Sequence, residues 1–202
     1  MQVLDKTRVE TLSQALGEPA WVLAKRLKAL EAFHHLPYPT KKDEAWRYTD
    51  LSQAPLEQEV EAPRGLRLSR DELPELVRRR LEKTDVSGFL VFVGPDLVYA
   101  EVPEELLAKG LVFTSLAEAL KRHPNKVENA LFQGVFTEDK FAAQNAAFFT
   151  HGAFLYVPAG LEVEKPLGVF KVLLEGEKAS AGRSLLFLED NAKAAYIEEY
   201  LS

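Results

Sequence analysis

The pattern of hydrophobic and polar residues predicts helices over the amino-terminal part of the chain. Apolar residues recur there at the three- and four-residue spacing that places them on one face of a helix. This spacing predicts a helix over residues 3–16 that ends at Gly17, and a second over residues 19–36. Residues 43–48 are expected to form a short helical turn. The second helix carries a leucine stripe made of Leu23, Leu27 and Leu30.

Two capping boxes mark helix starts in the middle of the chain. Ser69 with Glu72, and Ser115 with Glu118, have the spacing at which each side chain satisfies an unpaired N–H group of the first turn. The first box predicts a helix that continues to about residue 83, although a proline inside it can shift the start. The second predicts a helix that ends at a His-Pro pair. Helices are therefore expected over residues 116–122, 126–132 and 138–147.

Strand signals begin in the same region. Residues 52–68 are expected to form a loop followed by a strand, because prolines and a glycine lie among alternating glutamates and apolar residues. Residues 88–93 and 97–101 are apolar runs joined by Gly-Pro-Asp, which predicts a β-hairpin. Helices and strands thus mix in this part of the chain.

From Gly152 onward the period changes to that of short strands. Their spacing suits a sandwich, a jelly roll or a parallel solenoid equally well. On pattern alone the three remain open. The predicted strands cover residues 153–157, 161–163, 167–174, 184–189 and 194–201.

Composition restricts the chemistry of this 202-residue chain. It contains no cysteine, so a thiolate-ligated metal or iron-sulfur cluster is excluded. The net charge of -6 gives no reason to expect nucleic acid as a ligand. The basic run Arg78-Arg79-Arg80 is interpreted as a solvated helix face beside Glu75 and Glu82. No apolar run is long enough to span a bilayer and no signal-peptide pattern opens the chain, so we expect a cytoplasmic protein with no membrane partner.

Histidines and paired carboxylates are the candidates for a site. His34 and His35 end a predicted helix, where a ring complements the last carbonyl groups, and His151 is interpreted as a turn residue with a local hydrogen bond. Glu162 and Glu164 share a strand face, but a solvated face explains them better. No hydrolase elbow or phosphate-binding loop is present. We therefore predict no catalytic, cofactor-binding or metal residue. The remaining carboxylate pairs are Glu104-Glu105, Glu189-Asp190 and Glu198-Glu199.

Two motifs together resemble the SufB/SufD family of iron-sulfur cluster assembly proteins. They are the stretch NAAFFTHGAFLYVPAGLEVEKP at residues 145–166 and DEAWRYTDL at residues 43–51. In its lack of cysteine and its shortened amino-terminal region, the chain is more similar to SufD than to SufB. His151 departs from the family pattern, which argues against a shared acid-base or metal role there. The cluster Trp46-Arg47-Tyr48 is taken as structural, with Trp46 buried and Arg47 extended along the surface.

The resemblance implies an α+β fold in which amino-terminal helices and a small α/β unit precede the first coils of a right-handed parallel β-helix. We expect a helical region over residues 1–55, a mixed region over residues 56–137 and the truncated start of the β-helix over residues 138–202. Since each coil buries its apolar face against its neighbours, the chain is interpreted as an amino-terminal fragment.

The resemblance also implies a function without catalysis. The chain is expected to belong to a scaffold subunit that acts with a SufB-like homologue and the ATPase SufC, with no cofactor bound by this chain and the iron-sulfur cluster handled by the assembled complex. SufC binding is expected to need a carboxy-terminal helical domain. The alternatives are an interaction module that forms a homodimer through an open β edge and, further off, a carbohydrate-active β-helix protein.

Overall fold

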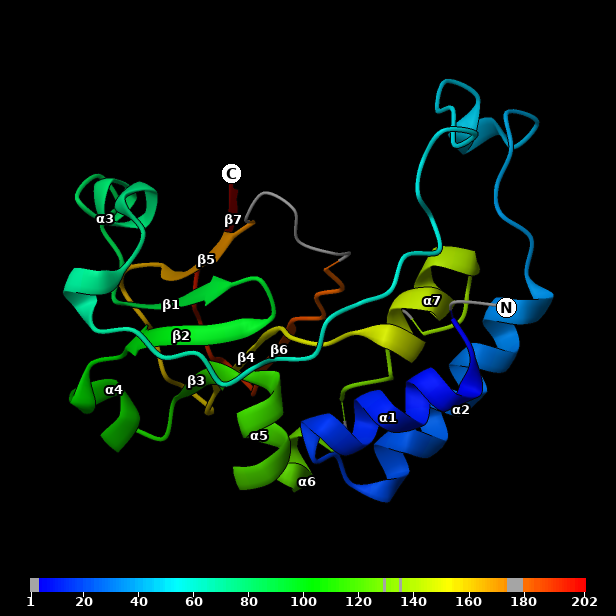
Figure 1. Ribbon diagram of the computed structural model, residues 1–202. Coiled ribbons are helices and arrows are strands. Elements are labelled where there is room, and N and C mark those ends of the chain that lie inside the picture. Colours follow the sequence, from blue (N-terminus) through cyan, green and yellow to red (C-terminus); the bar gives the residue numbers. More distant parts are fainter. Residues whose placement is uncertain (1–3, 129, 135, 174–179) are drawn as a thin grey trace.

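The computed structural model describes residues 4–128, 130–134, 136–173 and 180–202, and it has an α+β architecture (Figure 1). A group of helices lies on one side, and the strands lie on the other with further helices beside and below them. The α-helices are α1 (Lys6–Leu16), α2 (Ala20–His35), α3 (Glu75–Leu81), α4 (Glu104–Ala108), α5 (Leu116–Arg122), α6 (Pro124–Glu128) and α7 (Lys140–Phe148). Two short 3-10 helices are η1 (Glu44–Trp46) and η2 (Arg70–Glu72). The strands are β1 (Gly88–Val93), β2 (Asp96–Glu101), β3 (Val112–Ser115), β4 (Ala153–Val157), β5 (Leu167–Val172), β6 (Leu185–Leu188) and β7 (Tyr196–Leu201).

Helices α1, α2 and α7 share one hydrophobic core, which contains the buried Leu30 and Phe33 of α2. Arg26 of α2 is fully buried, with its guanidinium 2.7 Å and 2.6 Å from the two carboxylate oxygens of Glu18. The same guanidinium donates to the carbonyl oxygens of Ala147 and Phe149 at 2.9 Å and 2.8 Å. A buried charge with every guanidinium nitrogen hydrogen-bonded fixes α2 against the end of α7, where the chain enters β4.

The strands form two sheets, one in the order β2-β1-β5-β7 and the other in the order β3-β4-β6. A hydrophobic core with residues from both sheets, including Phe92, Leu155 and Val169, connects them. β4 pairs in parallel with β6, and β5 pairs in parallel with β7. Each of these pairs joins residues roughly 30 positions apart, which is the offset of a coiled repeat.

The two ends of this arrangement differ. At the amino-terminal end β2 and β3 each pair antiparallel with the strand beside them. Residues 64–68 lie beside β2. The Asp96 carboxylate accepts three of their backbone N–H groups, and the Leu68 N–H donates to the Val98 oxygen at 3.0 Å. At the other end, β6 and β7 each have one neighbouring strand among the described residues. The outer edge of β2 is therefore shielded, whereas β6 and β7 present open edges.

Most predicted elements are confirmed, with boundaries set by their caps. The first helix begins at Lys6 because the Asp5 carboxylate accepts the Arg8 N–H at 2.9 Å, and residues 1–3 lie outside the described part of the chain. It ends at Gly17 as predicted, in the left-handed conformation at φ 64°. The hairpin β1–β2, the capped helix α5 and strand β4 also match the predictions.

Several other predictions are wrong. No strand forms over residues 52–68, because the backbone there bonds mainly to its own turns and to the Asp96 side chain. Residues 161–163 form only a single parallel bridge, Glu162 to Lys193. The helix expected over residues 126–132 starts earlier and is shorter, since Pro124 suits a first turn. α4 and β3 were not predicted, and residue 174 of the third predicted strand lies outside the described residues.

Gly152 allows the backbone at residue 152 to approach the backbone at residue 183. A Cβ atom at this position would lie 1.7 Å from the carbonyl oxygen of Arg183, a backbone atom. We expect Gly152→Ala to lower the free energy of unfolding by about 3 kcal/mol, because the backbones must separate. Urea unfolding followed by circular dichroism measures the loss. Gly134→Ala is the matched control, since its added methyl meets no atom within 4 Å; equal stability of both variants would contradict the role of the close approach.

Candidate functional site: a buried charged cluster beside two open edges

The adjacent histidines lie at the end of α2. His35 Nδ1 is 2.7 Å from the Glu31 carbonyl oxygen in the preceding turn, and His34 Nε2 is 3.2 Å from the Leu4 carbonyl oxygen. The two rings therefore contact different backbone segments. Within the described residues, no group of three or more His, Cys, Asp or Glu side chains is placed to hold a metal ion.

The paired carboxylates differ in the hydrogen-bond and ion-pair partners that they contact. Glu162 and Glu164 flank the buried Val163 and are exposed, and Glu162 pairs with Lys193 at 3.4 Å. Glu104 and Glu105 are exposed on α4, and Asp190 is exposed after β6. Glu189 differs, because its carboxylate accepts the Tyr156 hydroxyl at 2.6 Å and the Ala159 N–H at 3.1 Å. These hydrogen bonds lower the pKa of Glu189.

The basic run on α3 is only partly solvated as predicted. Arg79 pairs with Glu75 one turn away at 2.5 Å. Arg80 instead reaches β7, where its Nε and Nη2 atoms both lie 2.6 Å from the Glu199 carboxylate. This two-point contact is the geometry in which an arginine fixes orientation, so α3 is tied to the edge strand.

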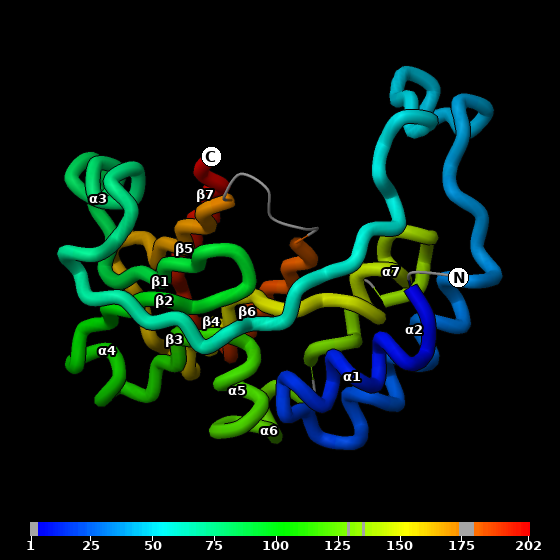
Figure 2. The backbone as a smooth tube through the Cα atoms, in the orientation of Figure 1, coloured from blue at the N-terminus to red at the C-terminus, as the bar shows by residue number. Residues whose placement is uncertain are grey.

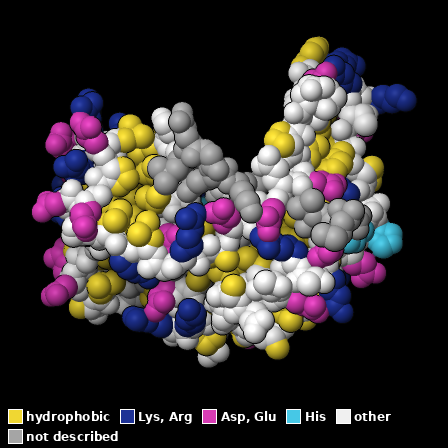
Figure 3. All heavy atoms as spheres, viewed as in Figure 1, with side chains coloured by type: hydrophobic (Ala, Val, Ile, Leu, Met, Phe, Trp, Pro, Cys, Tyr) yellow, Lys and Arg dark blue, Asp and Glu magenta, His cyan; other side chains and the backbone are white. Residues whose placement is uncertain are grey.

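The segment that carries Trp46 stands apart from the body of the molecule (Figure 2). Trp46 is half-buried and stacks on Phe141 of α7, with the ring centroids 5.3 Å apart, while Tyr48 is 92% exposed. The predicted burial of Trp46 is therefore wrong in degree, because the segment lies outside the core and contacts it through one face of the indole. Basic, acidic and hydrophobic side chains meet at its tip (Figure 3).

His151 is buried at the entry to β4. Its Nδ1 lies 3.1 Å from the Thr150 hydroxyl, and its ring centroid lies 5.8 Å from that of Phe92. The expected local hydrogen bond is present, but burial makes His151 part of the interior. Gly182 leaves room for it, because a Cβ there would lie 3.1 Å from both His151 Nε2 and Lys171 Nζ.

Lys171 and Glu198 form a buried ion pair across β5 and β7. The Lys171 side chain is 3% exposed, and its Nζ lies 2.6 Å from Glu198 Oε1 and 3.2 Å from the Tyr200 hydroxyl oxygen. The other oxygen of Glu198 accepts the hydroxyl groups of Ser184 and Tyr196 at 2.9 Å and 2.5 Å. We name Thr150, His151, Lys171, Ser184, Tyr196 and Glu198 the buried cluster; the first three are buried, the last three are partly buried, and the largely exposed Tyr200 lies at its edge.

The protonation states follow from these contacts. Burial alone raises the pKa of Glu198, but hydrogen bonds from Lys171 and Tyr196 outweigh it and lower the pKa to about 2. Burial, and then the nearby Lys171 ammonium, lowers the pKa of His151 to about 4. At neutral pH the cluster therefore holds an ionised Glu198 carboxylate beside a neutral His151 ring.

This arrangement fixes structure, because the contact between Lys171 and Glu198 joins β5 to β7, with Ser184 as a further tie. Sequence reasoning missed the cluster, although a lysine within the apolar run of residues 167–172 and the alternation Tyr196, Glu198, Tyr200 were visible signals.

Hydrophobic side chains are exposed near the open edges. Along β6, Leu186, Phe187 and Leu188 are each more than a third exposed, and Tyr200 of β7 is 61% exposed. Each strand lacks a second neighbour among the described residues. This combination of a free edge and apolar side chains is typical of a surface that another strand covers.

Among the described helices, none combines the length and apolar character that a membrane span requires.

Removing the carboxylate from the buried cluster should destabilise the protein. We expect Glu198→Gln to cost about 3 kcal/mol in urea unfolding at neutral pH, because it leaves the Lys171 ammonium buried without a counter-charge. Adding Lys171→Met to it should restore part of the loss. Glu162→Gln is the control, since it breaks an exposed pair and should leave stability unchanged. A loss no larger for Glu198→Gln than for this control would contradict the cluster's role.

His151 should make stability depend on pH. Its pKa is lower in the folded state than its ordinary value of 6.5, so the unfolded chain binds the proton first and stability falls as pH drops from about 6.5 towards 4. Between pH 6.5 and pH 5 the loss due to this group should be about 2 kcal/mol. Unfolding curves of His151→Gln at both pH values should show a correspondingly smaller fall. The control His35→Gln should keep the full fall; the same fall in His151→Gln would refute the assignment.

Comparison with known proteins identifies the family. A family model described as the SufBD protein N-terminal region matches residues 10–169. The chain is 31% identical over 207 residues to the iron-sulfur cluster assembly protein SufD of Bacillus subtilis, covering 98% of this chain and 46% of that protein. It is 29% identical over 204 residues to SufB of the same organism, covering 96% and 43%.

A SufBD family protein of Staphylococcus haemolyticus is 26% identical over 204 residues, again covering 96% of this chain and 43% of that protein. The chain thus spans less than half the length of these relatives. The family model, in contrast, covers most of the chain and includes both the Trp46 segment and the entry to β4. On this basis the chain belongs to the SufB/SufD family, and it corresponds to that family's N-terminal region.

Proposed function

We propose that this chain is part of a SufD-like, non-catalytic scaffold subunit in an iron-sulfur cluster assembly complex. The observation that carries the proposal is the family match over residues 10–169, together with relatives that are named iron-sulfur cluster assembly proteins. The absence of cysteine favours the scaffold role over direct cluster ligation, because thiolates are the usual cluster ligands. The cluster is then cargo of the assembled complex and not a cofactor of this chain.

The parallel strand pairs support a β-helix as the core of this subunit. The pairings β4–β6 and β5–β7 repeat at roughly the same offset, and the bridges His151–Gly182 and Glu162–Lys193 extend that register beyond the strands. In the proposed right-handed β-helix these are the first two coils. A following coil would pair with the free edges of β6 and β7 and cover the apolar side chains along them.

The proposed partners are a SufB-like homologue and a SufC-like ATPase in the cytoplasm, with no nucleic acid and no membrane involved. Since the chain spans less than half of its relatives, these partners belong to the whole subunit. The described residues contribute the capped beginning of the solenoid. We expect SufC to bind elsewhere in the subunit.

A second candidate function is that of an interaction module that forms homodimers through its β edge. The exposed Leu186 and Leu188 beside the free edge of β6 favour it. A carbohydrate-active role has less support, because the exposed Glu162 is already paired with Lys193 and the exposed Glu189 with Tyr156. Leu186→Lys combined with Leu188→Lys, which introduces two positive charges beside the edge, would abolish the homodimer in sedimentation analysis.

The assembly role is tested by isolating the natural gene product from its own organism with the proteins that accompany it. We expect mass spectrometry to identify a SufB-like homologue and a SufC-like ATPase in stoichiometric amounts. Deleting the gene should lower the activity of iron-sulfur enzymes, such as aconitase, in cell extracts. A product that travels only with copies of itself, with those activities intact after deletion, would overturn the assembly role and favour the interaction module.

A further inference from the structure

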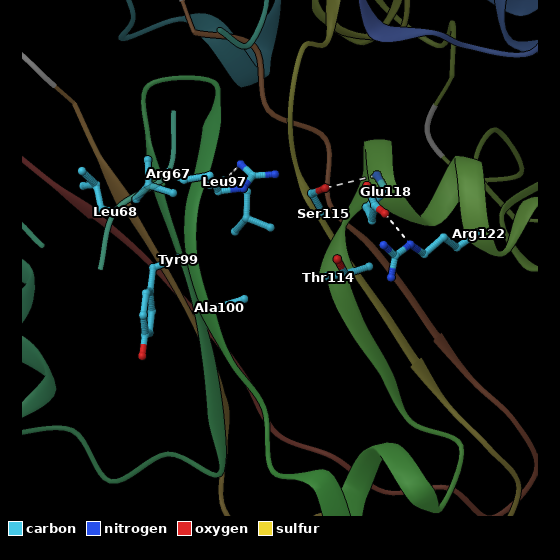
Figure 4. Close-up of a pocket in the computed structure, with 10 residues that line it drawn as sticks. Arg67, Leu68, Leu97, Tyr99, Ala100, Thr114, Ser115, Glu118 and Arg122 are labelled. Atoms are coloured by element: carbon cyan, nitrogen blue, oxygen red, sulfur yellow. Dashed lines mark hydrogen bonds and ion pairs between the residues drawn. The ribbon is translucent and has the colours of Figure 1, made fainter. Parts of the chain in front are cut away.

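A groove runs along the outer side of β3, between β2 and the helices α5 and α6. It consists of two adjoining cavities of about 420 Å³ and 550 Å³, which share Thr114, Glu118 and Arg122 in their linings. In Figure 4, β2 carries Leu97, Tyr99 and Ala100 on one side, and β3 and α5 carry Thr114, Ser115, Glu118 and Arg122 on the other. No residue of the buried cluster lines these cavities. The open edge of β6 approaches them only through Phe187, which stacks on Tyr156, so the groove is a separate feature.

The floor of the larger cavity is apolar. Leu111, Phe113 and Pro158 line it, and Leu107 of α4 stands at its side with 47% of its surface exposed. A volume of several hundred Å³ with such a lining is typical of a cavity that receives hydrophobic side chains. A ligand that matches the apolar floor therefore carries at least one hydrophobic group.

The rim of the groove is basic. Arg67, Arg122 and Lys126 line it together with His123, and the two linings contain one acid, Glu118, which offsets the charge of Arg122 at 2.5 Å. The Glu189 carboxylate, which accepts the Tyr156 hydroxyl, acts on Lys126 from outside the linings. Three cations and one acid leave the linings with a net charge of +2. The chain as a whole carries a net charge of -6, so this rim is opposite in sign to the rest of the molecule. Charge of this sign attracts carboxylates and repels cationic ligands.

The cation at the end of the groove is held in place before any ligand arrives. Lys126 Nζ lies 3.4 Å from the centroid of the Tyr156 ring. That ring is fixed in turn by its hydroxyl, which donates to Glu189, and by Phe187, which stacks on it at 5.9 Å with an interplanar angle of 16°. An ammonium group on a rigid aromatic support loses little freedom on binding, which favours affinity.

We propose that this groove binds an extended acidic segment of a partner protein, with a hydrophobic side chain on Leu107 and Phe113 and carboxylates on Arg122 and Lys126. The elongated, open shape suits a peptide rather than a compact small molecule, since the two cavities follow one another along β2 and β3. The few positive charges are too sparse for a nucleic acid backbone. The inference goes beyond the scaffold role and does not depend on it.

The test measures binding of fluorescein-labelled peptides to the purified chain by fluorescence anisotropy. The probe is a peptide in which glutamate and leucine alternate, compared with counterparts that alternate lysine with leucine and glutamate with serine. We expect the glutamate-leucine peptide to bind most tightly and to weaken as salt rises. Arg122→Glu combined with Lys126→Glu should weaken it by about tenfold or more, and Leu107→Ser should weaken it to a smaller extent.

The matched control is Lys28→Glu combined with Lys42→Glu, which makes the same charge change at two exposed lysines away from the groove and should bind like the unaltered chain. Thermal unfolding checks that each variant folds. With the unaltered chain, amide NMR signals of Thr114 and Lys126 should shift on titration while those of α2 remain in place. Failure of the glutamate-leucine peptide to bind, equal binding of the lysine-leucine peptide, or shifts confined to other surfaces would each overturn the proposal.

Discussion

The parallel pairing of β5 with β7 is the constraint on which the rest of the structure depends. β5 lies between β1 of the hairpin and β7, so it joins the amino-terminal half of the chain to the last strand. Within the β5–β7 pairing the Lys171–Glu198 ion pair fixes the register, because a slip by one residue would turn Glu198 to the other face of the sheet and leave the buried Lys171 without its carboxylate. Arg26 has a comparable place among the helices, where it holds α2 to the carbonyl groups that precede β4.

Features with local causes could be predicted from the sequence. The Ser115 cap predicts α5, and Gly17 predicts the end of α1, because a cap involves only its own turn. β3 was missed because residues 112–115 become a strand only by pairing with β4, about 40 positions later. The strand expected over residues 52–68 fails for the converse reason: its alternation is present, but Asp96 binds the backbone of residues 64–66 and no strand ladder forms there.

The site illustrates the same limit. The sequence indicates His151 as a turn residue, yet its burial beside Lys171 depends on the parallel bridge that brings Gly182 against it. Glu198 and Glu199 are neighbours in sequence, but alternation sends Glu198 into the buried cluster and Glu199 to Arg80. A pattern of paired carboxylates cannot distinguish these two environments until the partner strands are known. The family resemblance, in contrast, rested on two short motifs and was sufficient to identify the family.

The position of β5 also has a consequence for synthesis on the ribosome. The hairpin β1–β2 is complete by residue 101, but the strand that pairs with the other side of β1 begins only at Leu167. At ordinary translation speeds the fully apolar β1 therefore waits on the order of ten seconds with one edge unpaired. During that interval it can pair with the β1 edge of another nascent chain on the same messenger, so the order of the strands makes early protection by a chaperone valuable to this fold.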